Sequence, residues 1–296
     1  MFELTVGMAT YQDFDGVYFT VQDLRLHHDL ENVEILVVDN FGCSATAAVA
    51  AAGGLDGQVR YLRYTDKTGT AAPRQKVFEE ARGRAVLCMD SHVLLAPGAI
   101  ARLKQFYREN PGTLDLYQGP LLYDDLRGMS THFDPVWDAA MYGQWGYDPR
   151  VEPGKPFEIS MQGLGIFTCL KEAWLGFNER FRGFGGEEFY IHEKFRQAGR
   201  KCWCLPWLRW LHRFNRPQGV PYPLTAEDRI WNYLVGWQEL GLPLQAIYQH
   251  FLETVPAPTV ARLASEALGK QIAISIREQD TGSEVLLPFP GRSEAS

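Results

Sequence analysis

The sequence has no long apolar run, few cysteines and no excess of positive charge, and each absence excludes a class of protein. No apolar stretch approaches the roughly 20 residues that a membrane-spanning helix needs, so we expect no membrane partner. The 36 acidic residues outnumber the 29 basic ones, which gives a formal net charge of −7. This balance argues against broad binding to nucleic acid, which a basic surface would favour.

The five cysteines are dispersed and odd in number, and most stand in apolar surroundings. This pattern predicts reduced core thiols in a cytoplasmic protein rather than a disulfide framework. Cys202 and Cys204 have one residue between them and no second pair, so they do not make a zinc motif. The first residues already follow a strand-like pattern, and we therefore expect no signal peptide.

Two nucleotide-binding motifs are also missing. No Gly-x-Gly-x-x-Gly follows the first predicted strand, and no Gly-x-x-x-x-Gly-Lys-Ser/Thr occurs anywhere in the chain. The sequence therefore excludes the dinucleotide fingerprint and the P-loop as phosphate-binding elements.

Apolar strands alternate with helical segments through the first third of the chain. Val33–Val38 is a nearly continuous apolar run of the kind that is buried in a parallel sheet. The alternation predicts right-handed βαβ units and an α/β fold with a mostly parallel, Rossmann-like central sheet and flanking helices. The predicted strands are Phe2–Met8, Val33–Val38, Val59–Tyr64 and Ala85–Met89, and the predicted helices are Gly16–His27, Ala45–Ala52 and Thr68–Ala81.

The rest of the chain is less regular. We expect one strand over Asp115–Tyr123 and an irregular stretch over 124–157, whose aromatic side chains either stack on a ligand or cover the core. Further elements are predicted at Ala99–Asn110, Lys171–Leu175, Glu188–Ala198, Lys201–Leu205, Leu244–Val255, Thr259–Leu268, and from a Thr225 N-cap to Leu240. We divide the chain into a domain over 1–216 and a small helical carboxyl-terminal extension over 217–296, with a flexible tail after Asp280.

Polar side chains follow several of the predicted strands, where the strand ends of a doubly wound sheet converge. Thr10, Asp39 and Asp90 stand at such ends. Asp39 can accept hydrogen bonds from a base or a ribose, and Arg74, in the first turn of its helix, can pair with a diphosphate. The alternatives are that Asp39 shapes a turn and that Arg74 makes a surface salt bridge.

Asp90-Ser91-His92 follows the strand Ala85–Met89. Residues two apart in an extended chain point to the same side, so the Asp90 carboxylate and the His92 imidazole can bind one cation. His212, flanked by apolar residues, is the candidate third ligand. The alternatives are an Asp turn followed by a solvated histidine, and a structural core histidine at 212.

Several short motifs stand in order along residues 4–216. They are Val38-Asp39-Asn40, the segment from Gly69 to Arg74, Asp90-Ser91-His92, Ser160-Met-Gln-Gly163, Phe184-Gly-Gly-Glu-Glu188 and Arg209-Trp-Leu-His212-Arg-Phe214. With this order and spacing the chain resembles nucleotide-sugar glycosyltransferases of the GT-A fold, in particular the polypeptide N-acetylgalactosaminyltransferases and family 2 of the glycosyltransferases.

This resemblance implies a metal-dependent enzyme with the cation on Asp90, His92 and His212. Such a carboxylate–imidazole set suits Mn²⁺ better than Mg²⁺, although Mg²⁺ is possible. The resemblance also implies electrostatic assistance by Arg74, a hydroxyl anchor at Glu187 and, if the enzyme inverts, a base at Glu188. The implied donor-binding residues are Thr10, Tyr11, Asp39, Arg74, Asp90, Gln162 and Gly163.

One departure from the resemblance affects the stereochemistry. Glu188 stands where the retaining relatives have Asn and where family 2 enzymes have a catalytic Asp, so retention and inversion both stay open. The chain also lacks the lectin module and the membrane anchor of the animal enzymes. We therefore expect a short, cytoplasmic, bacterial or viral form.

The predicted reaction moves a hexose or an N-acetylhexosamine from a nucleotide-diphosphate donor, with a UDP-sugar favoured. The acceptor hydroxyl is open among a glycan, a lipid-linked sugar, a protein side chain and a modified base in phage DNA, the last disfavoured by the acidic charge. Two alternatives remain: a nucleotidyltransferase that makes a nucleotide sugar, and a catalytically inactive module that binds a sugar or a partner.

Overall fold

An eight-stranded sheet carries the candidate site, and the computed structural model describes residues 2–53, 59–152, 154–216, 219–272, 275–277 and 284–286. The strand order is β11-β13-β6-β12-β4-β1-β2-β3. In register, Thr10 pairs with Asp39 and Ala9 with Asp90, so three carboxyl ends lie at one edge. The parallel strands on this side of the sheet are β1 (Leu4–Thr10), β2 (Val33–Asp39), β3 (Val59–Arg63) and β4 (Ala85–Asp90).

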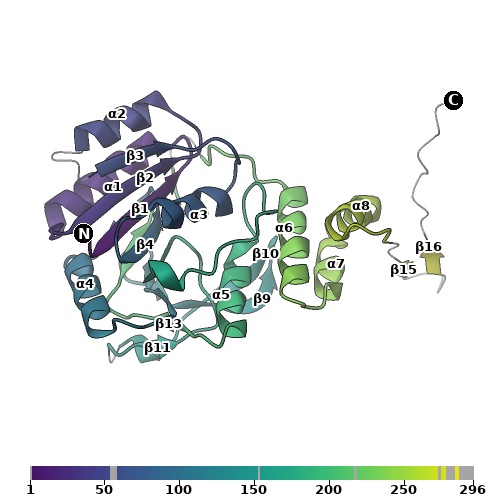
Figure 1. Ribbon diagram of the computed structural model, residues 1–296. Coiled ribbons are helices and arrows are strands. Elements are labelled where there is room, and N and C mark those ends of the chain that lie inside the picture. Colours follow the sequence, from purple (N-terminus) through teal and green to yellow (C-terminus); the bar gives the residue numbers. More distant parts are fainter. Residues whose placement is uncertain are drawn as a thin grey trace.

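Helices cover both faces of this sheet (Figure 1). The helices of this half are α1 (Phe14–His27), α2 (Ser44–Gly53), α3 (Ala71–Glu80) and α4 (Ala99–Glu109). α1 packs beside α2, whereas α3 packs on β1 and β2. Gly7 in β1 permits that approach, because a Cβ at this position would overlap Cγ1 of Val77 on α3. The predicted βαβ units and the mostly parallel sheet are thus confirmed.

In the other half of the sheet, the strand next to β4 runs antiparallel to it. This half consists of β6 (Leu116–Gln118), β11 (Phe157–Glu158), β12 (Ile166–Leu170) and β13 (Cys202–Cys204), and β12 pairs antiparallel with both β4 and β6. A four-stranded sheet lies alongside, in the order β5-β14-β7-β8. Its strands are β5 (Val93–Leu95), β7 (Leu121–Leu122), β8 (Met129–Ser130) and β14 (Trp210–His212).

Two predictions for this region are wrong. The single strand expected over Asp115–Tyr123 is divided into β6 and β7, which belong to different sheets, because the chain turns at Gly119-Pro120. A Cβ on Gly119 would overlap the Leu208 carbonyl oxygen, so the turn needs glycine. The stretch 124–157, expected to be irregular, holds β8 and a hairpin of β9 (His132–Asp138) and β10 (Met141–Gly146). Pro135 and Gly143 within that hairpin hide its strand pattern.

The carboxyl-terminal helices share the core of the main domain. α5 (Glu187–Gln197) packs against α6 (Ala226–Glu239), and α6 packs against α7 (Gln245–Phe251) and α8 (Ala257–Leu268). Thr225 caps α6, because its hydroxyl accepts a hydrogen bond from the Asp228 N–H at 3.1 Å. The predicted helices and cap are confirmed. The buried faces of these helices join the same apolar cluster as the central sheet, so the division at residue 216 stays a prediction.

The remaining described elements are two 3-10 turns and one pair of short strands. Pro149–Val151 and Lys171–Ala173 are the 3-10 turns, and β15 (Ser275–Arg277) pairs antiparallel with β16 (Glu284–Leu286). Apart from β16, the tail predicted to be flexible lies outside the described residues. Within the described part of the chain, the helices are too short or too polar to cross a membrane.

Candidate active site

The last residue of β4 is the centre of the site. Asp90 donates its backbone N–H to the Gly165 carbonyl at 2.9 Å, and Ser91 and His92 then turn the chain into β5. The Thr20 hydroxyl on α1 donates to the carbonyls of Ser91 and Val93, at 2.9 and 3.0 Å. This turn therefore has a fixed backbone, which holds Asp90 and His92 on one side.

His212 reaches the same place through strand pairing. β14 runs antiparallel to β5, and His212 lies opposite Val93 in the register. Asp90 Oδ2 is 3.5 Å from Nε2 of His212 and 3.9 Å from Nε2 of His92. One ligand atom from each of the three residues lies within 4.8 Å of the others, a spacing that fits a single cation. The structure thus brings together the three residues that the sequence suggested as metal ligands.

Asp13 orients one of these imidazoles and was not found from the sequence. Its Oδ2 lies 2.7 Å from Nδ1 of His92, and its Oδ1 accepts the Gly16 N–H at 3.2 Å as the cap of α1. A carboxylate on the remote nitrogen fixes the tautomer and ring orientation of a metal-binding histidine. Burial raises the pKa of Asp13, but the hydrogen bond and charge of His92 outweigh burial, and the pKa is lowered. The only sequence signal was an Asp three residues before the predicted helix Gly16–His27.

Arg74 links the strand end to the acidic pair of α5. Its guanidinium donates to Asp90 Oδ1 at 2.8 Å and to Glu187 Oε1 at 2.7 Å, and only 7% of its side chain is exposed. Burial would raise the pKa of Asp90, but the Arg74 charge and the His212 hydrogen bond hold it well below its usual value. Asp90 is therefore an anion at neutral pH, with Oδ1 on Arg74 and Oδ2 toward the two imidazoles.

The acidic pair begins α5 after a turn of three glycines. Gly183, Gly185 and Gly186 all have positive φ, at 54°, 98° and 93°. Glu187 is 1% exposed, and its Oε2 has no hydrogen-bond partner among the described residues. Glu188 is half-buried, and burial together with the adjacent Glu187 charge raises its pKa to about 7. A carboxyl group with this pKa can accept a proton near neutral pH.

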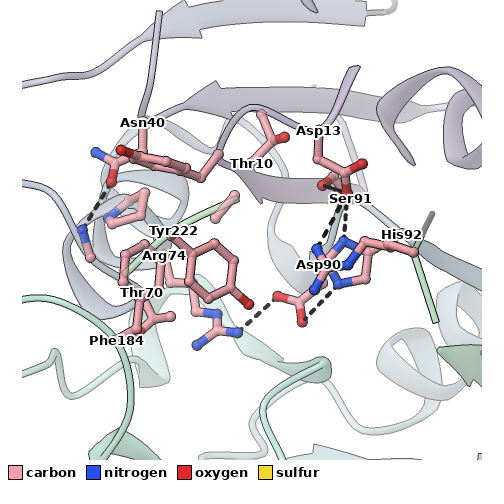
Figure 2. Close-up of a pocket in the computed structure, with 15 residues that line it drawn as sticks. Thr10, Asp13, Asn40, Thr70, Arg74, Asp90, Ser91, His92, Phe184 and Tyr222 are labelled. Carbon is pink, nitrogen blue, oxygen red and sulfur yellow. Dashed lines mark hydrogen bonds and ion pairs between the residues drawn. The ribbon is translucent and has the colours of Figure 1, made fainter. Parts of the chain in front are cut away.

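A cavity of about 60 Å³ lies beside Asp90 and Arg74 (Figure 2). The ring of Tyr222 stacks on Phe184 with centroids 3.9 Å apart, and Tyr11 meets both rings edge-on. The three rings line the cavity, and its volume is smaller than the several hundred Å³ typical of ligand pockets. The hydroxyls of Thr10 and Thr70, which line it, are buried without a partner in the described structure.

Arg216 is a further lining residue that sequence reasoning missed. Its side chain is 8% exposed, and its Nε has no hydrogen-bond partner among the described residues. Nη1 of Arg216 lies 4.0 Å from Asp13 Oδ2, and the guanidinium carbon of Arg216 is 5.9 Å from the centre of the Tyr222 ring. Neither Arg216 nor Tyr222 lies in a helix or a strand, so no periodic pattern marked them.

Three of the predicted donor-binding residues do not line this cavity. Asp39 is fully buried, and its carboxylate accepts bonds from the N–H groups of residues 41–43 and from the Tyr61 hydroxyl, so it stabilises a turn. Gln162 is fully buried, with Oε1 unpaired in the described part of the chain. Gly163 packs near Trp145, because a Cβ added to it would lie 3.2 Å from the indole ring. Thr10, Tyr11, Arg74 and Asp90 do line it, and Asn40 lies there in place of Asp39.

Comparison with known proteins identifies the family of the chain. The family model for glycosyl transferase family 2 matches residues 5–152. No curated protein sequence matches the chain.

Solved structures share the fold at low identity. A structure of GalNAc-T7 with UDP, GalNAc and Mn²⁺ matches 90% of this chain with a TM-score of 0.67 and 16% identity. S. aureus TarS 1–349 with UDP-GlcNAc matches 91% with a TM-score of 0.58 and 13% identity, and 82% of its chain is covered. The mannosyltransferase PcManGT of Pyrobaculum calidifontis, with GDP-Man and Mn²⁺, matches 90% with a TM-score of 0.52, 13% identity and 74% of its chain. The present chain spans 55% of the GalNAc-T7 chain.

Proposed function

The chain belongs to glycosyl transferase family 2 and has the GT-A fold, and on this premise we propose that it transfers a sugar from a nucleoside diphosphate donor to a hydroxyl acceptor in a metal-dependent reaction. One observation carries the proposal: the ligand atoms of Asp90, His92 and His212 converge within 4.8 Å at the carboxyl end of β4. Ligands of open α/β sheets bind at this edge, outside the strand ends.

The three side chains fit a divalent cation. They offer one carboxylate oxygen and two imidazole nitrogens, a set that favours Mn²⁺ over Mg²⁺. When bound there, such a cation supplies Lewis-acid neutralisation of the charge on a leaving diphosphate. Support comes from two neighbours, GalNAc-T7 and PcManGT, whose structures contain Mn²⁺.

The cavity residues suit a nucleotide diphosphate. The free hydroxyls of Thr10 and Thr70 can bond to polar groups of the nucleotide, and the stack of Tyr11, Phe184 and Tyr222 offers aromatic faces. Arg216 adds a buried positive charge to the same wall. Arg74 is already paired with two carboxylates, so its part is to hold Asp90 and Glu187 in place. A UDP-sugar is the proposed donor, because GalNAc-T7 and TarS bind UDP or a UDP-sugar.

Glu188 is the proposed base, which makes the proposed reaction inverting. Its raised pKa lets it take the proton of an acceptor hydroxyl near neutral pH. Glu187 keeps one unpaired oxygen that can bind a sugar hydroxyl. The transferred group is a hexose or an N-acetylhexosamine in this proposal, and the cytoplasmic location and the acceptor class stay predictions.

A screen of nucleotide sugars for hydrolysis, with and without Mn²⁺, tests the proposal. We expect the release of a nucleoside diphosphate from a UDP-sugar that stops when a chelator is added. Release of pyrophosphate from a nucleoside triphosphate and a sugar phosphate would instead show a nucleotidyltransferase. Specific binding of UDP and Mn²⁺ would raise the melting temperature of the protein. If no nucleotide sugar is hydrolysed and UDP with Mn²⁺ leaves the melting temperature unchanged, the proposed function is wrong.

A further inference from the structure

α6, which lies outside the part of the chain matched by the family model, holds the glycine turn in front of α5. Asn232 on α6 is 2% exposed, and its side-chain amide makes three hydrogen bonds to the turn. Oδ1 accepts the Arg182 N–H at 2.9 Å, and Nδ2 donates to the carbonyls of Arg182 and Gly185 at 2.7 and 2.8 Å. Gly186 packs on the same side chain, because an added Cβ would lie 3.1 Å from Asn232 Cβ.

The opposite side of the glycine turn is held by the loop before α3. Thr70 donates its N–H to the Gly183 carbonyl at 3.0 Å, and Gly183 donates its N–H to the Thr68 carbonyl at 3.2 Å. The turn is therefore clamped between this loop and α6. Because α5 begins at Glu187, directly after the turn, the position of the turn decides where Glu187 and Glu188 begin their helix.

Arg229, one helical turn before Asn232, places a positive charge on this turn. A Cβ on Gly185 would lie 2.8 Å from Arg229 Nε, so the guanidinium packs directly against the glycine backbone. Arg229 donates to the Ala140 carbonyl at 3.3 Å, whereas its buried Nε has no partner among the described residues. Arg229 is half-buried, and a partly buried cation without a carboxylate partner is costly unless a nearby charge compensates it.

We propose that α6 completes the active site, with Asn232 and Arg229 as positioning residues: Asn232 fixes the glycine turn that presents Glu187 and Glu188, and Arg229 supplies the compensating positive charge for the Glu188 carboxylate. The catalytic use of Glu188 rests on the proposed function, whereas the coupling of Arg229 to Glu188 does not. The extension is then part of the catalytic machinery rather than a separate appendage.

Charged and titratable groups from three elements surround Glu188. Glu187 on its own helix α5 disfavours the anion, whereas Arg74 on α3 and Arg229 on α6 favour it. Arg74 already has two carboxylate partners, Asp90 and Glu187. Arg229 has no carboxylate partner within hydrogen-bond distance in the described chain, and its charge adds to that of Arg74 at Glu188.

The test compares Arg229→Met, Arg229→Lys and the matched control Arg262→Met, an arginine in an exposed ion pair on α8. The pKa of Glu188 is read directly from the ¹³C-carboxyl NMR signal that disappears in Glu188→Gln. We expect Arg229→Met to raise this pKa by about one unit, as loss of a neighbouring opposite charge does, with Lys restoring it and the control unchanged. An unchanged pKa in folded Arg229→Met overturns the assignment of Arg229.

Catalytic consequences are measured separately. If Glu188 is the base, the acidic limb of the pH profile of kcat/KM moves upward in Arg229→Met by the same shift. A moved NMR pKa in a protein without transferase activity would keep the charge coupling and reject the proposed function. If the enzyme is active but the pKa of Glu188 does not move in Arg229→Met, the charge coupling is rejected and the proposed function is kept.

Asn232 is tested by Asn232→Ala with two controls for general damage. We expect kcat to fall by about tenfold or more, as misplacement of a catalytic group does, while the Kd for Mn²⁺ measured by calorimetry stays within about twofold, because Asn232 touches no metal ligand. Asn232→Ser, which keeps one hydrogen-bonding group, should recover part of kcat. Equal loss of kcat and of Mn²⁺ affinity, or full activity in a folded Asn232→Ala protein, would contradict the proposal.

Discussion

The cation side of the site, formed by Asp90, His92 and His212, and its acid side, formed by Glu187 and Glu188, are held by different kinds of structure. The cation side lies at strand ends, where parallel and antiparallel pairing sets each position. The acid side follows a glycine turn held by side chains and loops from elsewhere. Arg74 is the direct connection, with one hydrogen bond to each side. Strand pairing is maintained by many backbone hydrogen bonds, whereas the glycine turn is held by a few. A single substitution outside the site should therefore disturb the geometry of the acid side more easily than that of the cation side.

The largest expected effect is on the cation side. His212→Ala removes one imidazole from the three and should abolish metal-dependent turnover without unfolding the protein, because Asp90 keeps Arg74 as its partner. Calorimetric titration with Mn²⁺ and the donor hydrolysis assay measure the two losses. His27→Ala, an exposed histidine on α1, is the matched control. Full activity of His212→Ala after chelator treatment would refute the metal site.

Glu188→Gln probes the acid side and should lower kcat by about 10²–10⁴-fold, the usual contribution of a general base. In the parent enzyme kcat/KM should rise with pH up to about 7, because Glu188 is protonated and unable to accept a proton below its raised pKa. The Gln variant should lose this acidic limb. Glu193→Gln on the same helix serves as the control, and an unchanged limb in Glu188→Gln would exclude Glu188 as the base.

The same shift has a consequence for stability. A folded-state pKa above the ordinary value of 4.5 favours the protonated carboxyl group in the folded protein. This stabilisation is complete below the unfolded-state pKa and is lost as the pH rises through about 7. Urea unfolding of the parent and of Glu188→Gln should therefore show a difference in stability that changes in sign or size between acidic and neutral pH. A pH-independent difference would contradict the raised pKa.

A smaller effect is expected when the histidine support is weakened. Asp13→Asn can still cap α1 but replaces the carboxylate on His92 by a neutral amide, so Mn²⁺ affinity should fall by about tenfold, at the lower end for such outer partners. Calorimetry measures the Kd, and Asp148→Asn, which removes the charge from another capping carboxylate, is the control. Unchanged affinity would show that strand geometry alone orients His92.

The smallest expected effect tests the backbone of the glycine turn. Gly185→Ala forces a Cβ onto a residue with φ of 98° and places it 2.8 Å from Arg229 Nε, so unfolding free energy should fall by about 1–3 kcal/mol. Gly112→Ala, which has open space around it, should change little. Thermal or urea unfolding checks both, and equal stability of the two variants would show that the turn carries no strain constraint.

Local patterns were sufficient for much of this molecule. The alternation of apolar strands with helices predicts the βαβ half, and the i, i+2 spacing of Asp90 and His92 predicts that they share a side. The divided strand at Gly119-Pro120 and the hairpin within 124–157 were missed, because Pro and Gly obscure period-two patterns. Asp39 was expected near the donor, but the end of β2 is also a place where the chain turns, and the Asp39 carboxylate accepts hydrogen bonds from the N–H groups of that turn.

Sequence alone determined the residue types available for chemistry and the strands that carry Asp90 and His92, because these depend on neighbours within a few positions. Only the tertiary structure decided that His212 stands 3.5 Å from Asp90, that Asp13 supports His92, and that α6 clamps the acid side. These contacts join residues far apart in the chain. They arise from sheet register and helix packing, which are properties of the whole core and not of any local pattern.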